Sequence, residues 1–266
     1  MDYKTIFTAL LIGHFLGDFY FQSDAMANEK DKDIKVMCGH GLLYLLAVGI
    51  TAGPFLLCFN ASPSEWLPIA LIPVCHFIVD LIKRRWPGWG RLLKENQKAV
   101  LMVDQALHIL IAAVVAYNCA TTILVAYSAV GVRLQDIYAK LNLGLPAHKF
   151  VRLICLFLFM GKPANIFIQK IIFGDEGGEN NKNVKDNEAE KEQKAGRLIG
   201  IFERYLAVIL VILQQYSALA FVLTAKSIAR FDKISKEPKF AERYLLGTLS
   251  SVLSAVAGAV LYLYIP

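Results

Sequence analysis

Charged side chains are scarce in this 266-residue sequence: Asp, Glu, Lys and Arg make up only 19% of it, whereas 56% of the residues are hydrophobic. The charges are confined to short stretches between long apolar runs, a distribution that argues against a soluble domain. The runs also lack sustained alternation of apolar and polar residues, which argues against strands. Several runs reach the roughly 20 residues that a helix needs to cross the hydrocarbon layer. The sequence therefore predicts an all-α, polytopic transmembrane helix bundle.

Cysteine pairs are missing as well. The five cysteines are scattered over the apolar runs and form no C-x-x-C pair, so we interpret them as small buried residues in a reducing compartment. No small-residue cleavage site interrupts the apolar residues 6–21, so we expect a retained first helix. The net charge of +6 comes from Lys and Arg beside the ends of apolar runs. Such residues orient membrane helices, so we do not expect nucleic acid as a partner.

The apolar runs divide into about eight helices. We expect them at residues 3–22, 36–59, 65–85, 99–127, 150–173, twice within 197–231, and at 244–264. The Trp-containing segment 86–98 and the mixed segment 131–149 are predicted to lie at the membrane surface. The charged, low-complexity segment 174–196 cannot bury apolar surface and is predicted to be a mobile loop. These features suggest an N-terminal domain, 1–149, and a C-terminal domain, 150–266, which this loop interrupts.

Basic residues predict the orientation of the helices. The segments 83–98 and 226–243 each hold six Lys or Arg and should both lie on the cytoplasmic side. Both can do so only if residues 197–231 cross the membrane twice, with a turn near Gln214, Gln215 and Tyr216. The resulting bundle has its N- and C-termini outside, and we expect it in the cell inner membrane as a multi-pass protein.

Histidine and aspartate recur inside the predicted membrane helices. Three patterns place a His and an Asp one helical turn apart and a further His stands alone, which gives the set His14, Asp18, His40, His76, Asp80, Asp104 and His108. Residues four apart lie on one helix face, and the predicted topology puts all seven at a similar depth in the inner half of the bilayer. Imidazole and carboxylate together suit a transition metal.

Energetics favour a bound cation at this depth. An unpaired aspartate near the middle of a span costs roughly 2.5–3.5 kcal/mol, whereas a structural zinc can contribute on the order of 10–16 kcal/mol. We therefore predict one or two divalent ions, zinc, manganese or iron. Three alternatives remain open at this stage: hydrogen-bonded His–Asp pairs that only join helices, haem ligation, and a proton or ion path.

A second polar set lies in the C-terminal part. It comprises Lys162, Asn165, Glu203, Arg204, Lys226 and Arg230. One interpretation is an anion site at the inner membrane surface, since Arg and Lys bind phosphate. The other is a structural ion pair of Glu203 with Lys226 or Arg230 across a helix hairpin.

These motifs in combination resemble a known family. The residues are His14-x-x-x-Asp18-Phe19-x-x-Gln22, His76-x-x-x-Asp80, Asp104-Gln105-x-x-His108, the Gly-Arg-Leu-Ile-Gly-x-x-Glu-Arg stretch and the Ala-Lys-Ser-x-x-Arg-Phe stretch. Over most of its length the chain resembles the bacterial membrane proteins of domain-of-unknown-function family 3307. The resemblance implies a polytopic bacterial membrane protein and no particular activity. A looser similarity, to membrane-bound metal-dependent hydrolases, is analogy only.

The leading hypothesis is a membrane-embedded metal-dependent hydrolase acting at the inner face on a phosphorylated lipid or another anionic, membrane-associated phosphate compound. Asp18, Asp80 and Asp104 are the candidate catalytic residues, with any carboxylate that is not a ligand acting as general base. Gln22 and Gln105 would orient the ligands, and the C-terminal polar set would hold the substrate. The rival hypotheses are a transporter or channel for a metal ion or an anion, and a structural or accessory subunit. A homo-oligomer is compatible with each of the three.

Overall fold

The computed structural model describes residues 3–30, 32–58, 63–85, 96–122, 128–141, 144–173 and 187–264. Within these ranges the secondary structure is helical and contains no strand, as predicted. The chain divides into two compact units, Met1–Cys155 and Leu156–Pro266. The division falls inside a helix, six residues beyond the boundary expected from the sequence. Each unit is described separately below.

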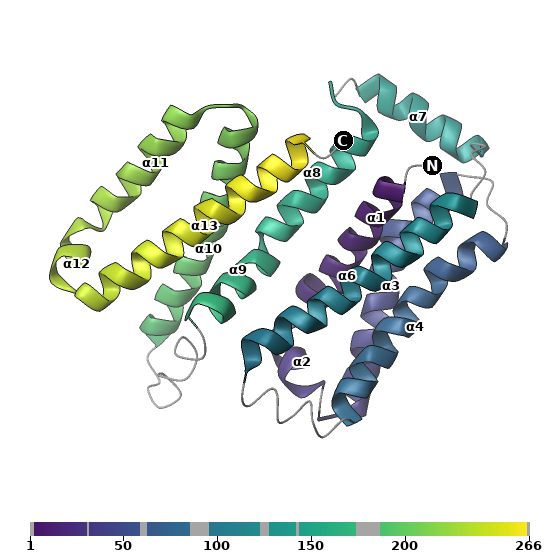
Figure 1. Ribbon diagram of the computed structural model, residues 1–266, viewed down its shortest axis with the longest axis horizontal. Helices are drawn as coiled ribbons and strands as arrows, with labels where there is room; N and C mark the ends of the chain where they lie inside the picture. The colour runs from purple at the N-terminus through teal and green to yellow at the C-terminus, as the bar shows by residue number, and fades with distance from the viewer. Residues whose placement is uncertain are drawn as a thin grey trace. The chain divides into compact units, whose positions relative to one another are not determined.

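Unit 1 is built around four long helices (Figure 1). They are α1 (Tyr3–Phe15), continued by the π-helix η1 (Leu16–Phe21), then α3 (Ile34–Cys58), α4 (Pro63–Arg85) and α6 (Gln97–Thr122). Helix α1 packs on α3 and α6, and α4 packs on the same two helices, so the four form a closed ring. The short helix α2 (Asp24–Glu29) follows η1 in the chain and packs on α3. Helix α7 (Ala129–Leu141) packs on α3 at the C-terminal end of that helix.

The interior of this ring changes character along its length. One half holds an apolar core, made of Ile6, Leu10, Tyr44, Val48, Ala52, Ile69, Ile72, Ala112, Ala116 and Cys119. The clustered histidines and aspartates occupy the other half, about one or two turns from the nearest core residue of the same helix. The apolar core therefore closes the bundle on one side of the polar cluster.

The outward faces of the ring are apolar. On α4, for example, the exposed residues Leu67, Leu71, Val74, Ile78 and Ile82 recur every three or four positions. Cys119 is buried, Cys38 is exposed and the other three cysteines are partly buried, so the expectation of buried cysteines is confirmed for Cys119 and wrong for Cys38. An apolar exterior around a polar interior is the arrangement that a lipid environment favours. A weakly polar thiol is tolerated on such an exterior.

Unit 2 contains the remaining helices. They are the end of α8 (Ala147–Met160), α9 (Lys162–Ile168) with the π-helix η2 (Gln169–Phe173), α10 (Asn187–Ile212), α11 (Tyr216–Ala229), α12 (Phe231–Lys236) and α13 (Pro238–Tyr264). Helix α13 packs on α10 around the buried residues Leu156, Met160, Ala207, Val208 and Ala255. A side chain at Gly258 would overlap Met160 and Leu156, so glycine permits this close approach.

Several predicted boundaries can be compared with these helices. The turn predicted near Gln214 is confirmed: α10 ends at Ile212, Gln214 has a positive φ of 59°, and α11 begins at Tyr216. The predicted loop 174–196 was wrong in its last part, because α10 begins at Asn187 and one long helix carries the charged residues into the apolar run. The interfacial segment 86–98 lies largely outside the described residues, as do residues 174–186 of the loop.

In the part of the chain that the structure describes, three helices are long and apolar enough to cross a membrane, within Ile34–Pro54, Lys98–Ala120 and Pro238–Tyr264. A fourth candidate is the bent pair Ala147–Met160 and Lys162–Phe173. Helix α11 is apolar but shorter. These helices support a membrane protein, whereas the number of eight crossings and the outside position of both termini remain predictions.

Candidate metal site

Each of the four ring helices brings one histidine to a common point in unit 1. These are His14 of α1, His40 of α3, His76 of α4 and His108 of α6, and each is at most 5% exposed. Three groups that could hold a metal ion lie there, namely His14–Asp18–His76, His40–His76–Asp80 and Asp80–Asp104–His108. The structure thus brings together all seven residues singled out in the sequence, and the groups share His76 and Asp80.

The centre of the cluster is a triangle of ligand atoms. His40 Nε2 lies 3.1 Å from His76 Nε2, and Asp18 Oδ1 lies 3.4 Å and 3.2 Å from these two nitrogens. In a tetrahedral zinc site with bonds of about 2.0–2.1 Å, neighbouring ligand atoms are about 3.3 Å apart. Asp18 Oδ1 is buried and makes no hydrogen bond of good geometry among the described residues. The triangle therefore has the dimensions of a face of a zinc site.

Asp80 approaches the same two nitrogens. Its Oδ2 lies 3.6 Å from His40 Nε2 and 3.5 Å from His76 Nε2. The His40–His76 pair is therefore common to two triangles, one completed by Asp18 and the other by Asp80. Two nitrogen and two oxygen donors are a ligand set that suits zinc, iron or manganese.

His14 is fixed in one orientation by Gln105. His14 Nε2 lies 3.1 Å from Gln105 Oε1, and the Gln105 amide donates to Asp104 Oδ2 at 3.4 Å. Because Oε1 can only accept, the proton of His14 must be on Nε2, which leaves a lone pair on Nδ1. Nδ1 faces Asp18 Oδ2 at 3.7 Å and the Tyr44 hydroxyl at 3.3 Å. Gln105 thus occupies the orienting position expected for it.

His108 connects the centre to the more exposed edge of the cluster. Its Nδ1 lies 3.3 Å from His76 Nδ1, and its Nε2 lies 3.3 Å from Asp104 Oδ1. If His76 binds a metal through Nε2, its proton is on Nδ1, and His108 must then accept at Nδ1 and carry its own proton on Nε2. The Asp104 side chain is 18% exposed, compared with 7% for Asp18 and 2% for Asp80. This chain of contacts therefore fixes the tautomers of His76 and His108 and links them to the more exposed edge.

Two lysines in the cluster were missed in the sequence. Lys83 Nζ contacts Asp80 Oδ1 and lies 2.5 Å from Asp104 Oδ1, while Lys30 Nζ lies 3.2 Å from Asp80 Oδ2. The expectation that the aspartates have no cationic side chain beside them is wrong for Asp80 and Asp104. With neutral histidines, two ammonium groups face three carboxylates. Among the described residues one excess negative charge remains, and the ion-pair contacts of Asp18 there are with histidines.

Tyr44 and Gly17 shape the wall of the site. The Tyr44 ring stacks on the His76 ring with centroids 3.7 Å apart and an interplanar angle of 4°. A Cβ atom at Gly17 would lie 2.5 Å from Tyr44 Cδ2, so only glycine lets the ring lie against η1. The π-helix begins at Leu16, between His14 and Asp18, and π-helical turns are frequent at functional sites. Gln22 follows as the C-cap of η1, and its role beside a ligand remains a prediction.

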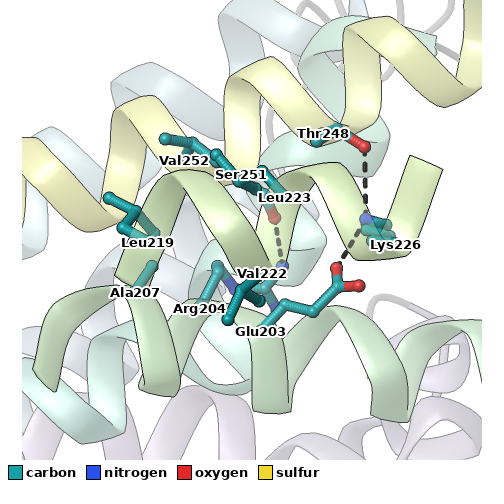
Figure 2. A pocket seen from close by; sticks show the side chains of 10 residues that line it. All are labelled: Glu203, Arg204, Ala207, Leu219, Val222, Leu223, Lys226, Thr248, Ser251 and Val252. Carbon is teal, nitrogen blue, oxygen red and sulfur yellow. Dashed lines mark hydrogen bonds and ion pairs between the residues drawn. The ribbon is translucent and has the colours of Figure 1, made fainter. Parts of the chain in front are cut away.

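The C-terminal polar set is arranged differently (Figure 2). Lys226 Nζ donates to Glu203 Oε2 at 2.6 Å and to Thr248 Oγ1 at 3.1 Å. Arg204 is buried and donates to Met160 O at 2.7 Å, to Ser251 Oγ at 3.1 Å and to Gly161 O at 3.4 Å. These contacts join α10 to α8, α11 and α13, so they favour the structural interpretation of Glu203 and Lys226.

The cavity beside this set has a volume of only about 20 Å³. That is room for about one water molecule and not for a phosphate group. Lys162 and Asn165 lie in α9, and Arg230 is the C-cap of α11. None of these three lines the cavity as the structure describes it. The structure therefore does not bring the six residues of the predicted substrate site to one cavity.

The fold and the cluster together define a helical protein with helices long and apolar enough to cross a membrane and a buried His/Asp site of metal-binding composition. Residues 6–133 match the family described as "Protein of unknown function (DUF3307)", so the N-terminal part of this chain belongs to that family. The match covers the seven clustered residues, Lys30, Lys83 and Tyr44, but it stops short of the C-terminal motifs, so the resemblance covers less than expected. No curated protein and no solved structure matches the chain.

Proposed function

We propose that the four-helix ring of unit 1 is the metal centre of a membrane-embedded hydrolase that acts on an anionic phosphate compound at the cytoplasmic face. The observation that carries this proposal is the triangle of His40 Nε2, His76 Nε2 and Asp18 Oδ1, with edges of 3.1–3.4 Å. Zinc, manganese or iron fits these donors, and Asp80 and His14 are placed to complete one or two ions. The bound ion supplies a Lewis acid and lowers the pKa of a coordinated water.

The remaining residues of the cluster have distinct roles in the proposed site. His108 and Asp104 would hold His76 in the tautomer that leaves Nε2 free to bind the ion, because they form a hydrogen-bonded chain from His76 Nδ1 to the more exposed edge. The Asp104 carboxylate at that edge would act as the general base that takes a proton from the attacking water. Gln105 holds His14 in the tautomer with a lone pair on Nδ1. Asp18 and Asp80 act as ligands. Of the three aspartates predicted to be catalytic, Asp104 is therefore the one assigned to proton transfer.

The interior of the ring favours hydrolysis over transport. A transporter requires polar groups on both sides of its binding site, whereas the buried residues beyond the cluster form the apolar core around Leu10, Val48, Ile72 and Ala116. Thr8 and Thr51, which lie in that half, bond the carbonyls of their own helices. The apolar core closes one side of the site, and we call the other side, which holds the partly exposed Lys30, Lys83 and Asp104, the open side. A site closed on one side is the arrangement expected of an enzyme that works at one membrane face.

The charge of the open side supports an anionic substrate. Lys30 and Lys83 reach the cluster from this side, with side chains that are 15% and 11% exposed. Ammonium groups beside a metal ion suit a phosphate ester. We propose a phosphorylated lipid, because the site lies between apolar helices that a bilayer would surround. These two lysines replace the C-terminal set as the proposed substrate-binding groups.

The test combines metal analysis with hydrolysis by the purified full chain. The informative variants are His40→Ala and Asp18→Asn, and the matched controls are His148→Ala and Asp136→Asn, which change an exposed histidine and an exposed aspartate. After loading with zinc, manganese or iron, the wild type and both controls should retain at least about one ion per chain. The two site variants should lose most of it, with elution profiles in detergent that show folded protein.

Hydrolysis is then measured as phosphate released from phosphatidic acid and other phosphate monoesters in mixed micelles. The wild type and controls should release phosphate only when loaded with metal, and the site variants should not. Retention of metal by His40→Ala and Asp18→Asn would refute the site. Metal binding without turnover of any phosphate ester would refute the hydrolase, and metal flux in reconstituted vesicles would then identify a transporter.

A further inference from the structure

Lys30 and the two central histidines surround the same carboxylate oxygen. Asp80 Oδ2 lies 3.2 Å from Lys30 Nζ, 3.6 Å from His40 Nε2 and 3.5 Å from His76 Nε2. A metal ion held by His40, His76 and Asp80 would bind to this oxygen at about 2.0–2.2 Å. The ion and the Lys30 ammonium group would then lie side by side against the same buried oxygen atom. Their mutual repulsion is strong there, because little water is present to screen it.

The two lysines on Asp80 differ in how firmly they are held. Lys83 belongs to the long helix α4, contacts the other oxygen of Asp80 and also pairs with Asp104 at 2.5 Å. Lys30 follows the six-residue helix α2 as its C-cap, and Asp80 is its recorded ion-pair partner. Lys83 can therefore remain in place when Asp80 Oδ2 changes partner, whereas Lys30 can move away.

We propose that Lys30 competes with the metal ion for Asp80 and thereby sets the metal affinity of the site. Metal binding expels the Lys30 ammonium group toward the open side of the cluster, where it becomes available to an anionic substrate. The inference rests on the metal site of the proposed function but does not require hydrolysis. It predicts that removing a positive charge near Asp80 strengthens metal binding, and that Lys30 becomes more accessible when metal binds.

The first experiment compares zinc affinities of the full chain in detergent, measured by competition with a chelator. Lys30→Met removes the competing charge and keeps the apolar part of the side chain. The matched control is Lys32→Met, because Lys32 is exposed and lies two residues away. Lys30→Met should bind zinc about tenfold more tightly than both the wild type and Lys32→Met, which is the typical effect of one hydrogen bond to a charged group.

The second experiment follows the accessibility of Lys30 in the wild type. An amine-acetylating reagent is applied with and without zinc, and the modification of each lysine is measured by mass spectrometry. Zinc should raise the acetylation rate of Lys30 several-fold while leaving the exposed residues Lys32 and Lys35 unchanged. This readout compares neighbouring lysines in one molecule, so it does not depend on the folding of a variant.

The outcomes separate this inference from the proposed function. An unchanged or weaker zinc affinity of Lys30→Met relative to Lys32→Met would overturn the competition, and so would protection of Lys30 by zinc. The metal site and the hydrolase would then still stand. Tighter binding by Lys30→Met without phosphate release by the wild type would support the competition and refute the hydrolase. Absence of zinc binding by all three proteins would overturn both.

Discussion

Replacing Gly17 with alanine should weaken both the ring and the metal site. The new Cβ atom would lie 2.5 Å from Tyr44 Cδ2, 3.2 Å from Tyr44 Cγ and 3.3 Å from Tyr44 Cα. Ordinary contacts begin near 3.4 Å, so the Tyr44 ring must withdraw by about 1 Å. The main chain of α3 must also give way slightly, because Tyr44 Cα is itself closer than an ordinary contact. Overpacking of this kind typically lowers the free energy of unfolding by about 1–3 kcal/mol.

The displaced ring would also disturb a ligand. Tyr44 stacks on His76 at 3.7 Å, and His76 Nε2 is one of the two nitrogens that both triangles share. A shift of about 1 Å is large for a metal site, which needs its ligands within a few tenths of an ångström. We therefore expect the zinc affinity of Gly17→Ala to fall by at least about tenfold. Changing a residue that supports a metal ligand typically weakens binding by about 10- to 100-fold.

The matched control is Gly39→Ala on the neighbouring helix α3. A Cβ atom at Gly39 meets nothing within 4 Å in the described structure, so alanine should stabilise the helix by about 0.5–1 kcal/mol. Unfolding is followed by thermal denaturation in detergent, and zinc affinity by chelator competition. The double variant Gly17→Ala with Tyr44→Ala, compared with Tyr44→Ala, should show little further loss, because the clashing ring is gone. Equal stability of Gly17→Ala and Gly39→Ala would refute the reasoning.

Three further predictions concern single contacts. Gln105→Leu should reduce zinc affinity about 10- to 100-fold by freeing the His14 tautomer, whereas Gln135→Leu on the exposed face of α7 should leave it unchanged in the same chelator assay. Arg204→Met should lower the free energy of unfolding by about 2–3 kcal/mol, because two main-chain carbonyls and a hydroxyl lose their charged donor. An unchanged melting temperature would contradict this. Chelation of metal should lower the melting temperature of the wild type, and added zinc should restore it. A ligand present at about 100 times its Kd stabilises the folded state by about 2.7 kcal/mol. The melting temperature of Asp18→Asn should not respond to chelator or zinc.

The candidate ligands could be found in the sequence because their spacing is local. A His and an Asp four residues apart lie on one helix face whatever the tertiary structure, and basic flanks placed the four helices in alternating directions. The turn at Gln214 was found by the same charge argument. Both inferences use distances along one helix or the order of charges along the chain.

Contacts between distant segments could not be found in this way. Lys83 was interpreted as one of three basic residues flanking a membrane helix, and Lys30 as part of a polar loop, yet both reach Asp80, Lys30 from 50 positions away. Tyr44 looked like any aromatic residue of an apolar helix until its ring was seen on His76. Arg204 was predicted to bind an anion, but its donors are directed to the carbonyls at the end of α8.

The pairing of Arg204 with Met160 O and Gly161 O makes the break between α8 and α9 a permanent bend. The two segments meet at 40°, and straightening them would pull these carbonyls away from an arginine anchored on α10. A straight helix over Ala147–Phe173 would measure about 40 Å, whereas the bent pair reaches about 35 Å along its first segment. In a bilayer, the arginine would thus shorten an overlong segment toward the roughly 30 Å hydrocarbon thickness. We expect that its loss would make this segment sensitive to the thickness of the membrane around it.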